Sequence, residues 1–329
     1  MECKEKGKKM KIFRKERLAD GRRHIFFCGM KIASYMHRHK KHFAAHKLSY
    51  KSYGDLIFDI KRNIVKIPSD IDLIVGVPRS GMVPAYMIGL ALSKQVCSLP
   101  EFIAGMWGEH GQTRKIHTTT KIKKVLIIDD TVSSGKSMTR VKERIAEIGL
   151  DKKYDCLYMA VYGANNDAFD YADIILEILP QPRMFAWNYL NHVYLENAGL
   201  NIDGVLCVDP TPEENDDGKN YVNFVLNARP LYLPKEKVAA LITSRLEKYR
   251  PQTEQWLREH NVQYDKLYML ENMTAEERRR KGVHAKHKAN ILKQHPEVSF
   301  FIESDPKQAQ EIAKITGRPV FCSTNDEKY

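Results

Sequence analysis

Short apolar runs and segments with helical periodicity alternate along the chain, most clearly around residues 125–148. Val125 to Ile128 form a continuous apolar run that is too short for an amphipathic helix and that predicts a buried strand. From Lys136 onward, apolar side chains recur at helical spacing, at positions 138, 141, 145 and 148, which predicts a helix. The pattern therefore predicts a strand, a tight turn and a helix in direct succession.

The same alternation predicts an α/β domain over residues 51–195. Helices are predicted at residues 53–60 and 82–92, and strands at residues 73–77, 156–162 and 174–179. Strands that alternate with helices in this way are typical of a doubly wound parallel sheet with helices on both faces. The chain has 329 residues, which is enough for a second domain of ordinary size, and we place that domain at residues 196–329.

Candidate chemistry lies in the predicted turn. Asp129 and Asp130 end the strand, and the residues after them are small and rich in hydroxyl groups. The turn consists of Thr131, Val132, Ser133, Ser134, Gly135, Lys136 and Ser137. Free N–H groups and the dipole at a helix N-terminus bind phosphate, whereas a pair of carboxylates suits hydroxyl donors or a metal ion. The turn thus predicts a site for a phosphorylated sugar with a free diol; an ordinary capped turn is the alternative.

This stretch resembles the signature of type I phosphoribosyltransferases, enzymes that use 5-phosphoribosyl 1-pyrophosphate (PRPP). The resemblance lies in the hydrophobic strand, the two acids and the Thr-x-x-Ser-Gly sequence of residues 131–135. It implies that Asp129 and Asp130 are catalytic residues that hold the 2- and 3-hydroxyls of the ribose. It also implies that residues 131–137 hold the 5-phosphate.

A second loop resembles the same family. Residues 73–77 are followed by Pro-Arg-Ser-Gly at positions 78–81, where the family has its pyrophosphate loop. The resemblance implies that Arg79 supplies charge and that the backbone of Ser80 and Gly81 approaches the pyrophosphate. Because pyrophosphate leaves with several negative charges, we expect Mg²⁺ as the cofactor.

Two further features of the first domain each have two interpretations. Residues 101–120 form a long polar connection. The resemblance implies that this connection is a mobile lid and that Arg114 and Lys115 contact the pyrophosphate; a disordered loop is the alternative. Trp187 either stacks on an acceptor base, as an aromatic residue does in purine-type relatives, or packs in the core. No segment resembles the acceptor region of a particular salvage enzyme.

Residues 198–207 resemble the first motif of the haloacid dehalogenase superfamily, a strand followed by Asp-x-Asp-Gly-x-Leu. Later motifs follow in the family's order, which implies a second doubly wound parallel sheet, of haloacid dehalogenase-like phosphatase type. Asn201 replaces the acid that accepts the phosphoryl group, and Asp203 is the expected general acid. An amide neither attacks phosphorus well nor offers a charged ligand to a metal.

The later motifs supply the other candidate residues of this domain. Thr243 and Ser244 are the expected phosphate-binding hydroxyls, and Lys288 or its neighbour Lys286 is the expected phosphate-binding lysine. The expected Mg²⁺ ligands are Asn201, Asp203, Glu303 and Asp305.

Positive charge is concentrated at the N-terminus. The formal net charge is +12, of which residues 1–50 carry +11 and the remainder +1. We predict that this basic arm lies on an anionic membrane surface; nucleic-acid binding and a solvated tail are the alternatives. Residues 21–35 resemble the basic, aromatic leader of some surface-polysaccharide glycosyltransferases, which favours the membrane.

The cysteines and the apolar runs bear on the cellular compartment. The six cysteines have no CxxC or zinc-type spacing, and the sequence has no secretory signal and no apolar run near 18 residues. These features predict a cytoplasmic protein with reduced thiols, at most peripheral at the inner face of the membrane.

The pairing of two phosphate-handling domains predicts a function. A transferase leaves a 5-phosphate on the new ribosyl group, and a phosphatase on the same chain would remove it, which gives net ribosylation of an acceptor such as a glycan or a polyol. This resembles the transferase and phosphatase pairs of capsule polysaccharide synthesis. The alternatives are a nucleobase phosphoribosyltransferase of orotate or purine type, for which the phosphatase would be counterproductive, and a PRPP-sensing regulator that binds nucleic acid.

Overall fold

The computed structural model divides the chain into two compact units, Met1–His42 and Phe43–Tyr329. It describes the backbone of five strands within residues 2–36, and both backbone and side chains of residues 48–107, 121–271, 273, 277 and 282–329.

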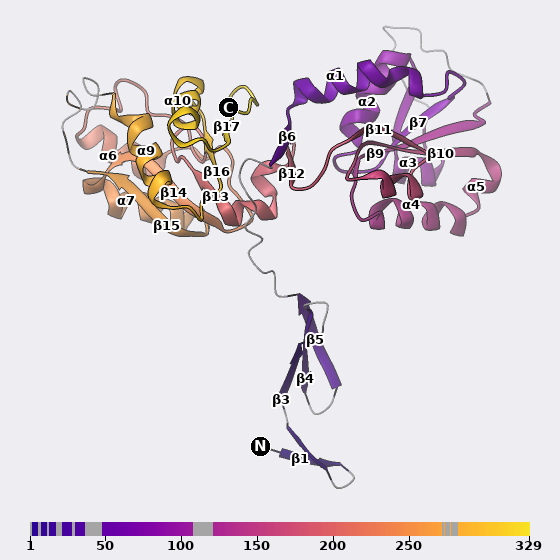
Figure 1. Cartoon of the computed structure of the whole chain (residues 1–329), viewed down its shortest axis with the longest axis horizontal. Coiled ribbons are helices and arrows are strands. Elements are labelled where there is room, and N and C mark those ends of the chain that lie inside the picture. Colours follow the sequence, from indigo (N-terminus) through magenta and orange to yellow (C-terminus); the bar gives the residue numbers. More distant parts are fainter. Residues whose placement is uncertain are drawn as a thin grey trace. The chain divides into compact units, whose positions relative to one another are not determined.

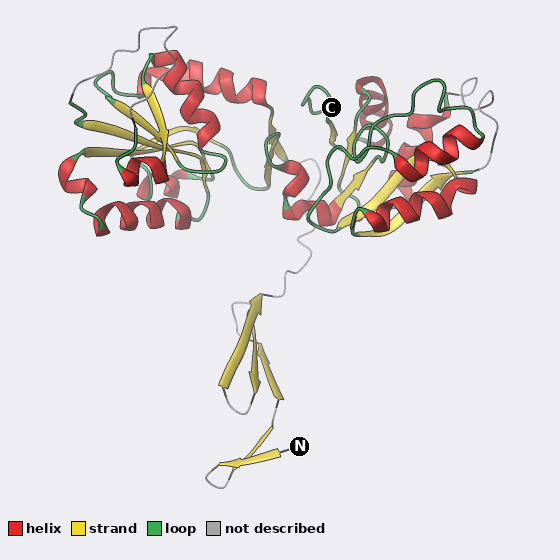
Figure 2. Cartoon of the chain, turned by 180° about the vertical axis from the view of Figure 1, so that it is seen from behind, coloured by secondary structure: helices red, strands yellow, loops and turns green. Residues whose placement is uncertain are grey.

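The N-terminal unit contains antiparallel strands (Figures 1 and 2). β1 (Glu2–Glu5) pairs with β2 (Lys8–Lys11). A three-stranded sheet has the order β3-β4-β5, formed by β3 (Phe13–Arg17), β4 (Arg22–Phe27) and β5 (Met30–Met36). The basic, aromatic stretch of the arm thus lies in β4 and β5.

The first parallel sheet has the strand order β11-β10-β9-β7-β8. Its strands are β7 (Leu73–Gly76), β8 (Gln95–Ser98), β9 (Lys124–Val132), β10 (Asp155–Gly163) and β11 (Ile174–Ile178). Its helices are α1 (Tyr53–Asn63), α2 (Met82–Leu92), α3 (Leu99–Ala104), α4 (Lys136–Glu147) and α5 (Leu150–Lys153), with short 3₁₀ turns at Ile64–Lys66 and Asn166–Asp170. The predicted helices and strands of this region are confirmed, but β9 continues through Thr131 and Val132, the first two residues of the predicted turn. β8, α3 and α5 were not predicted.

Alternating residues of β9 explain why the sequence has a continuous apolar run there. Val125 and Ile127 pack in one core with α3 and α4, whereas Leu126 and Ile128 pack in a second core with α1 and α2. All four side chains are completely buried, as expected for a strand covered on both faces.

A small two-stranded sheet connects the cores. β6 (Ser49–Lys51) pairs in parallel with β12 (Arg183–Phe185), and 3₁₀ turns at Tyr189–Asn191 and Val193–Asn197 follow. Phe185 belongs to a core of the first sheet, whereas Leu48 and Met184 belong to a core of the second. The basic arm therefore ends before residue 50, the boundary expected from composition, because Leu48 is already buried.

The second parallel sheet has the strand order β15-β14-β13-β16-β17. Its strands are β13 (Ala198–Leu200), β14 (Val238–Leu246), β15 (Tyr264–Leu270), β16 (Phe300–Glu303) and β17 (Val320–Cys322). Its helices are α6 (Lys219–Asn227), α7 (Arg250–Glu259), α9 (Val283–Gln294) and α10 (Pro306–Thr316), with a 3₁₀ turn at Glu247–Tyr249. The second predicted α/β region thus contains a parallel sheet.

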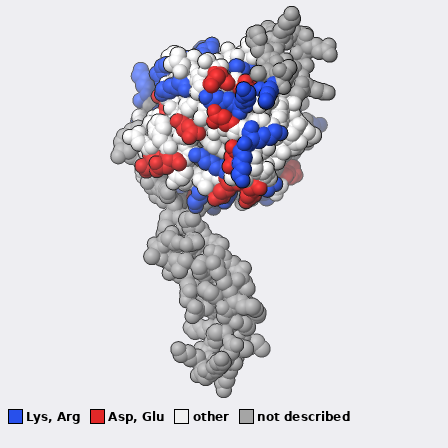
Figure 3. Space-filling view, turned by 90° about the vertical axis from the view of Figure 1, so that its right-hand side faces the viewer, with Lys and Arg blue, Asp and Glu red and all other residues white. Residues whose placement is uncertain are grey.

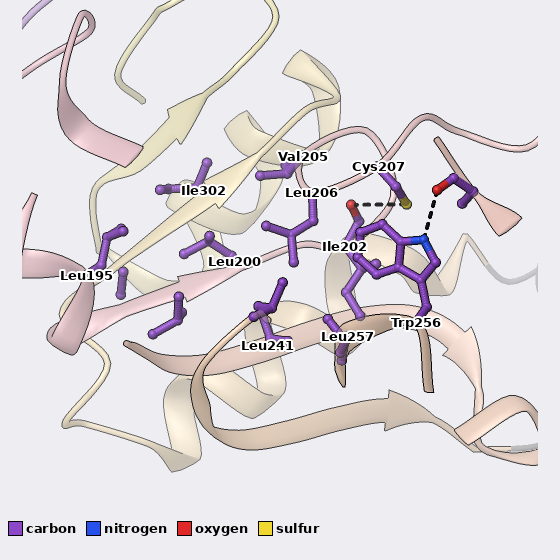
Figure 4. Close-up of a cluster of buried hydrophobic side chains, with 14 of the residues drawn as sticks. Leu195, Leu200, Ile202, Val205, Leu206, Cys207, Leu241, Trp256, Leu257 and Ile302 are labelled. Atoms are coloured by element: carbon purple, nitrogen blue, oxygen red, sulfur yellow. Dashed lines mark hydrogen bonds between the residues drawn. The ribbon is translucent and has the colours of Figure 1, made fainter. Parts of the chain in front are cut away.

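This sheet also has a core on each face. One lies under α6 and α7, where Leu200, Leu241 and Ile302 meet Trp256 and Leu257 (Figure 4). The indole N–H of Trp256 donates to the carbonyl oxygen of Ala228 at 2.8 Å. The other core lies under α9 and α10.

Charges of both signs mix on the surface of the larger unit. On the face shown in Figure 3, Lys and Arg side chains lie among Asp and Glu side chains, as expected from the near-zero net charge of residues 51–329. No helix within the described residues is long and apolar enough to cross a membrane. Cys97, Cys156, Cys207 and Cys322 are free thiols.

Candidate functional site

The first candidate site lies where the strand order of the first sheet reverses. The chain runs from β7 outward to β8, and then returns to β9 on the other side of β7. The loops that leave β7 and β9 therefore diverge, and in open α/β sheets this place binds ligands. The hydroxyl of Ser80, in the loop after β7, donates to Oδ1 of Asp130, at the end of β9, at 2.9 Å.

Gly81 lets the loop after β7 approach β9 closely. A Cβ atom at this position would lie 2.5 Å from the carbonyl oxygen of Val77 and 2.7 Å from that of Ile128, so a larger residue would push the loop away. Gly81 also precedes α2 and provides no side chain to cap it. Arg79 is exposed in the same loop, and its peptide bond to Pro78 is cis.

The two acids of β9 are buried next to each other. Asp129 accepts hydrogen bonds from the N–H of Asp130 at 2.9 Å and from the hydroxyl of Ser137 at 3.2 Å. Oδ2 of Asp130 accepts from the indole N–H of Trp187 at 2.6 Å. In the described part of the chain neither acid has a salt-bridge partner. Burial, and then the charge of Asp130, raise the pKa of Asp129 to about 7.

The turn between β9 and α4 has the backbone of an anion site. Gly135 precedes α4 with φ of 70°, and a Cβ atom here would lie 2.2 Å from the ring of Tyr171. A glycine is therefore required, and since it has no side chain, the first N–H groups of α4 stay available to an anion. Ser133 and Ser134 are exposed in this turn.

Thr131 has a different role from the serines. Its hydroxyl donates to the carbonyl oxygen of Tyr162 at 3.1 Å and accepts from the guanidinium of Arg183. Its side chain thus bonds to the protein itself, as does that of Ser137, whose hydroxyl donates to Asp129. The exposed hydroxyls of Ser133 and Ser134 are therefore the side-chain donors that the turn offers.

The second candidate site is a cavity of about 180 Å³ in the second sheet. It lies where the order of that sheet reverses, between β13 and β16. Its lining includes Asn201, Asp203, Asp209, Ser244, Arg245, His284, Lys288 and Gln308. Four of the candidate residues of the second domain, Asn201, Asp203, Ser244 and Lys288, thus line one cavity.

Asn201 and Lys288 both bond to Glu303 in this cavity. The amide of Asn201 donates to Oε1 of Glu303 at 3.0 Å and to the carbonyl oxygen of Asp203 at 2.9 Å. The ammonium group of Lys288 lies 2.6 Å from Oε2 of Glu303. Both side chains of this ion pair are almost completely buried, and the pair distinguishes Lys288 from the exposed Lys286.

Asp203 is held by a second buried cation. The guanidinium of Arg245 donates to Oδ1 of Asp203 at 2.6 Å and, through Nε, to Oδ2 at 3.1 Å. Arg245 is 1% exposed. The sequence gave Asp203 the role of a general acid, but in the structure its carboxylate forms an ion pair.

These bonds bear on the expected Mg²⁺. Mg²⁺ needs oxygen ligands with free lone pairs, but Asn201 turns its N–H toward Glu303, and the carboxylates of Asp203 and Glu303, two of the expected ligands, are neutralised by cations. Within the described residues, no group of three or more His, Cys, Asp or Glu side chains could hold a metal ion. The residues present therefore do not fit Mg²⁺.

Two residues of the second site differ from their expected roles. The carboxylate of Asp305, an expected metal ligand, caps α10 by accepting from the N–H groups of Lys307 and Gln308 at 2.8 and 3.0 Å. Thr243 is completely buried and accepts from the N–H of Arg245, so that Ser244 provides the hydroxyl on the cavity wall. One oxygen of Asp305 thus serves as the N-cap of α10, a role that was not predicted from the sequence.

The first site lies within the part of the chain that matches a known family. Residues 39–161 match the family model of the phosphoribosyl transferase domain. The matched range includes both the loop after β7 and the acids of β9. No curated protein matches the sequence.

Three solved structures are similar to part of the chain. The xanthine-guanine-hypoxanthine phosphoribosyltransferase of Helicobacter pylori is 17% identical, with 43% of this chain and 92% of that chain covered and a TM-score of 0.34. A purine phosphoribosyltransferase of Pyrococcus horikoshii is 19% identical, with 43% of this chain and 93% of that chain covered and a TM-score of 0.30. The orotate phosphoribosyltransferase of Aeropyrum pernix is 14% identical, with 38% of this chain and 70% of that chain covered and a TM-score of 0.26.

Three further residues were expected or are found near the first site. Arg114 and Lys115, the expected lid contacts, fall outside the described residues. Arg183 was missed: it is 3% exposed and donates to the carbonyl oxygens of Leu179 at 2.7 Å and Val132 at 3.1 Å. In the described part of the chain, the sequence feature that could have indicated its role is a basic residue next to the apolar residues 184–187. Burial lowers its pKa to about 10.

Proposed function

We propose that this chain transfers the phosphoribosyl group of PRPP to an acceptor. The observation that carries the proposal is the bond from Ser80 to Asp130, because it joins the loop after β7 to the acids of β9 in one site. The family match over residues 39–161 supports this activity. The site then offers a place for each part of PRPP.

The acids and the two helix ends have separate roles in this proposal. The ribose hydroxyls donate to Asp129 and Asp130, whose present donors are all neutral and leave lone pairs on the carboxylates. The 5-phosphate accepts from the first N–H groups of α4 and from the serine hydroxyls of the turn. The pyrophosphate accepts from the N-terminus of α2 and pairs with Arg79, which is exposed and charged.

Mg²⁺ fits this first site better than the second. The carboxylates of Asp129 and Asp130 have no salt bridge within the described residues, so they can face a cation that PRPP brings. Bound Mg²⁺ would offset the charge that develops on the leaving pyrophosphate. The residues of the chain themselves orient the sugar and hold both phosphates.

For the second sheet we propose a haloacid dehalogenase-like fold that receives the phosphorylated product. An aspartate at position 201 would complete removal of the 5-phosphate and give net ribosylation of a glycan or polyol, as in surface-polysaccharide synthesis. With Asn201, we expect hydrolysis to be slow or absent. A nucleobase acceptor is the second candidate, since the names of the similar solved structures are those of purine and orotate phosphoribosyltransferases.

The test is pyrophosphate release from PRPP and Mg²⁺ in the presence of a panel of bases, polyols and sugar phosphates. The double variant D129N/D130N should bind PRPP at least about 100-fold more weakly, because each hydrogen bond to a charged group is worth about 1.5–3 kcal/mol, and should lose transfer while staying folded. Unchanged transfer in the double variant would refute the assignment.

A further inference from the structure

The indole of Trp187 touches the acid pair from outside the matched family range, which ends at residue 161. Its N–H donates to Oδ2 of Asp130 at 2.6 Å, and the hydroxyl of Ser80 donates to Oδ1 at 2.9 Å. The two donors come from different parts of the chain, one after β7 and one after β12. Each oxygen of Asp130 is thus held by one of them.

Aromatic neighbours fix the direction of this indole. Its ring is stacked on Phe185, with the centroids 4.7 Å apart and the planes at 19°. Tyr162 lies beyond, nearly parallel at 6.4 Å, and Tyr53 is tilted at 5.8 Å. Because Phe185 is itself 3% exposed, the indole cannot turn without disturbing a packed core. The N–H therefore points at Asp130 before any ligand arrives.

We propose that Trp187 is a positioning residue for PRPP, which together with Ser80 holds the Asp130 carboxylate ready for the ribose hydroxyls. The proposal rests on the proposed function of this site. A carboxylate oxygen can accept more than one hydrogen bond, so both oxygens of Asp130 can still receive a hydroxyl. A carboxylate that is already oriented loses less freedom on binding. Trp187 packs against a core of the first sheet, as one of its two predicted interpretations has it, and its N–H in addition holds Asp130.

The first test is the variant W187F, which keeps an aromatic ring over Phe185 but removes the N–H. Titration calorimetry with PRPP and Mg²⁺ should show about tenfold weaker binding, the loss expected for one hydrogen bond to a charged group. S80A should weaken binding similarly. Since both donors orient the same carboxylate, the double variant W187F/S80A should lose less than the product of the two single effects.

The second test reads the hydrogen bond directly. The chain has three tryptophans, and the indole N–H of Trp256 donates to Ala228 in the core of the second sheet, which makes it an internal reference. Addition of PRPP and Mg²⁺ should shift the indole N–H resonance of Trp187, assigned from its loss in W187F, and leave that of Trp256 in place. D130N should move the Trp187 resonance without ligand.

The outcomes separate this inference from the proposed function. If the unaltered protein does not bind PRPP, both fail. If it binds PRPP but W187F binds equally well, with an unchanged Trp187 resonance in D130N, the positioning role is refuted and the transferase assignment stands. If W187F binds PRPP normally but loses turnover with an acceptor, Trp187 serves the acceptor and the inference is wrong.

Discussion

The acid site of the first sheet and the cavity of the second sheet have equivalent places in their folds but different electrostatics. Both lie where the strand order of a parallel sheet reverses. In the first, Asp129 and Asp130 accept hydrogen bonds only from neutral donors among the described residues. In the second, buried cations neutralise both Asp203 and Glu303.

The two sites differ in charge balance and not in their place in the fold. We infer that charge balance decides whether such a site can accept a ligand or is already satisfied by the protein. Uncompensated acids are costly to bury and gain free energy when a ligand brings hydroxyl groups or a cation. Compensated acids instead connect secondary structure: Lys288 joins α9 to β16, and Arg245 joins β14 to the turn after β13. The following experiments alter one side of this comparison at a time.

The largest expected effect comes from removing a cation of the second site. K288M leaves the buried Glu303 without a cation, with only neutral donors such as Asn201, and breaking a buried ion pair in this way costs about 3–5 kcal/mol of the free energy of unfolding. Urea denaturation measures the loss. K286M changes the exposed neighbouring lysine and should stay within about 0.5 kcal/mol of the unaltered protein. A loss below about 1 kcal/mol for K288M would mean that the pair does not stabilise this site.

At the first site a substitution is expected to raise the free energy of unfolding instead, because burial raises the pKa of Asp129 to about 7, well above its usual range. A raised pKa in the folded state means that stability is complete below about pH 4 and falls as pH rises toward 7. D129N removes this loss and should be more stable than the unaltered protein at pH 8, by at most about 4 kcal/mol for a rise of about three pKa units.

Denaturation curves at pH 5 and pH 8 measure this difference, which should shrink at the lower pH. D170N, a change of an exposed carboxyl group in the 3₁₀ turn after β10, serves as the control and should leave the pH dependence unchanged. Equal stability of D129N and the unaltered protein at both pH values would show that the acid pair is solvated rather than strained.

A smaller effect is expected from N201D, which makes the second site resemble the first. The substitution replaces the amide that donates to Glu303 at 3.0 Å by a carboxylate that repels it, and so creates a demand for a divalent cation. At a Mg²⁺ concentration ten times the dissociation constant, N201D should gain about 1.4 kcal/mol, seen as a higher melting temperature. N201D should also release phosphate from the transferase product.

N215D adds a carboxylate elsewhere on the cavity lining and is the matched control for this effect. The unaltered protein and N215D should show no Mg²⁺-dependent melting temperature from this site. Equal phosphate release by the unaltered protein and N201D would mean that residue 201 is not the nucleophile position.

The smallest effect on the enzyme is expected from deleting residues 1–42, the separate N-terminal unit. We propose that this basic unit attaches the protein to anionic surfaces, and its removal should abolish sedimentation with anionic lipid vesicles without changing turnover. The cut leaves Leu48 and β6 in place, since these residues belong to the larger unit. Binding to duplex DNA with a steep salt dependence, and none to vesicles, would favour a nucleic-acid partner instead.

Local sequence patterns predicted the elements that position the sites. The apolar run of β9, the bounds of α2 and the acids at strand ends could all be read from short stretches, because burial on both faces and helix period leave direct signals. The hydrogen bonds of Arg183 and Arg245 could not be predicted from such stretches, since each joins segments about 40 to 50 residues apart. The charge of such a residue is visible in the sequence, but its partner is not.

The structure also shows why similar patterns had different outcomes. Asp305 follows a strand of the second sheet closely, and Asp129 lies near the end of a strand of the first. Asp305 nevertheless caps a helix, because Pro306 and the next residues begin α10 immediately. Trp187 has the same ambiguity, since an aromatic residue after a strand can face the core, a ligand or an acid. Only the position of Asp130 in the folded chain shows that the indole N–H of Trp187 bonds to an acid.

The small sheet of β6 and β12 limits how this chain can be recombined. Its strands come from positions more than 130 residues apart. Three successive residues of β12 contact three different regions: Arg183 bonds to the end of β9, Met184 packs in a core of the second sheet and Phe185 in a core of the first. Neither the part with the first parallel sheet nor the part with the second can therefore be exchanged by itself. A chimera that replaced the second sheet with a phosphatase from another protein would have to keep residues 48–51 and 183–194 matched to both partners.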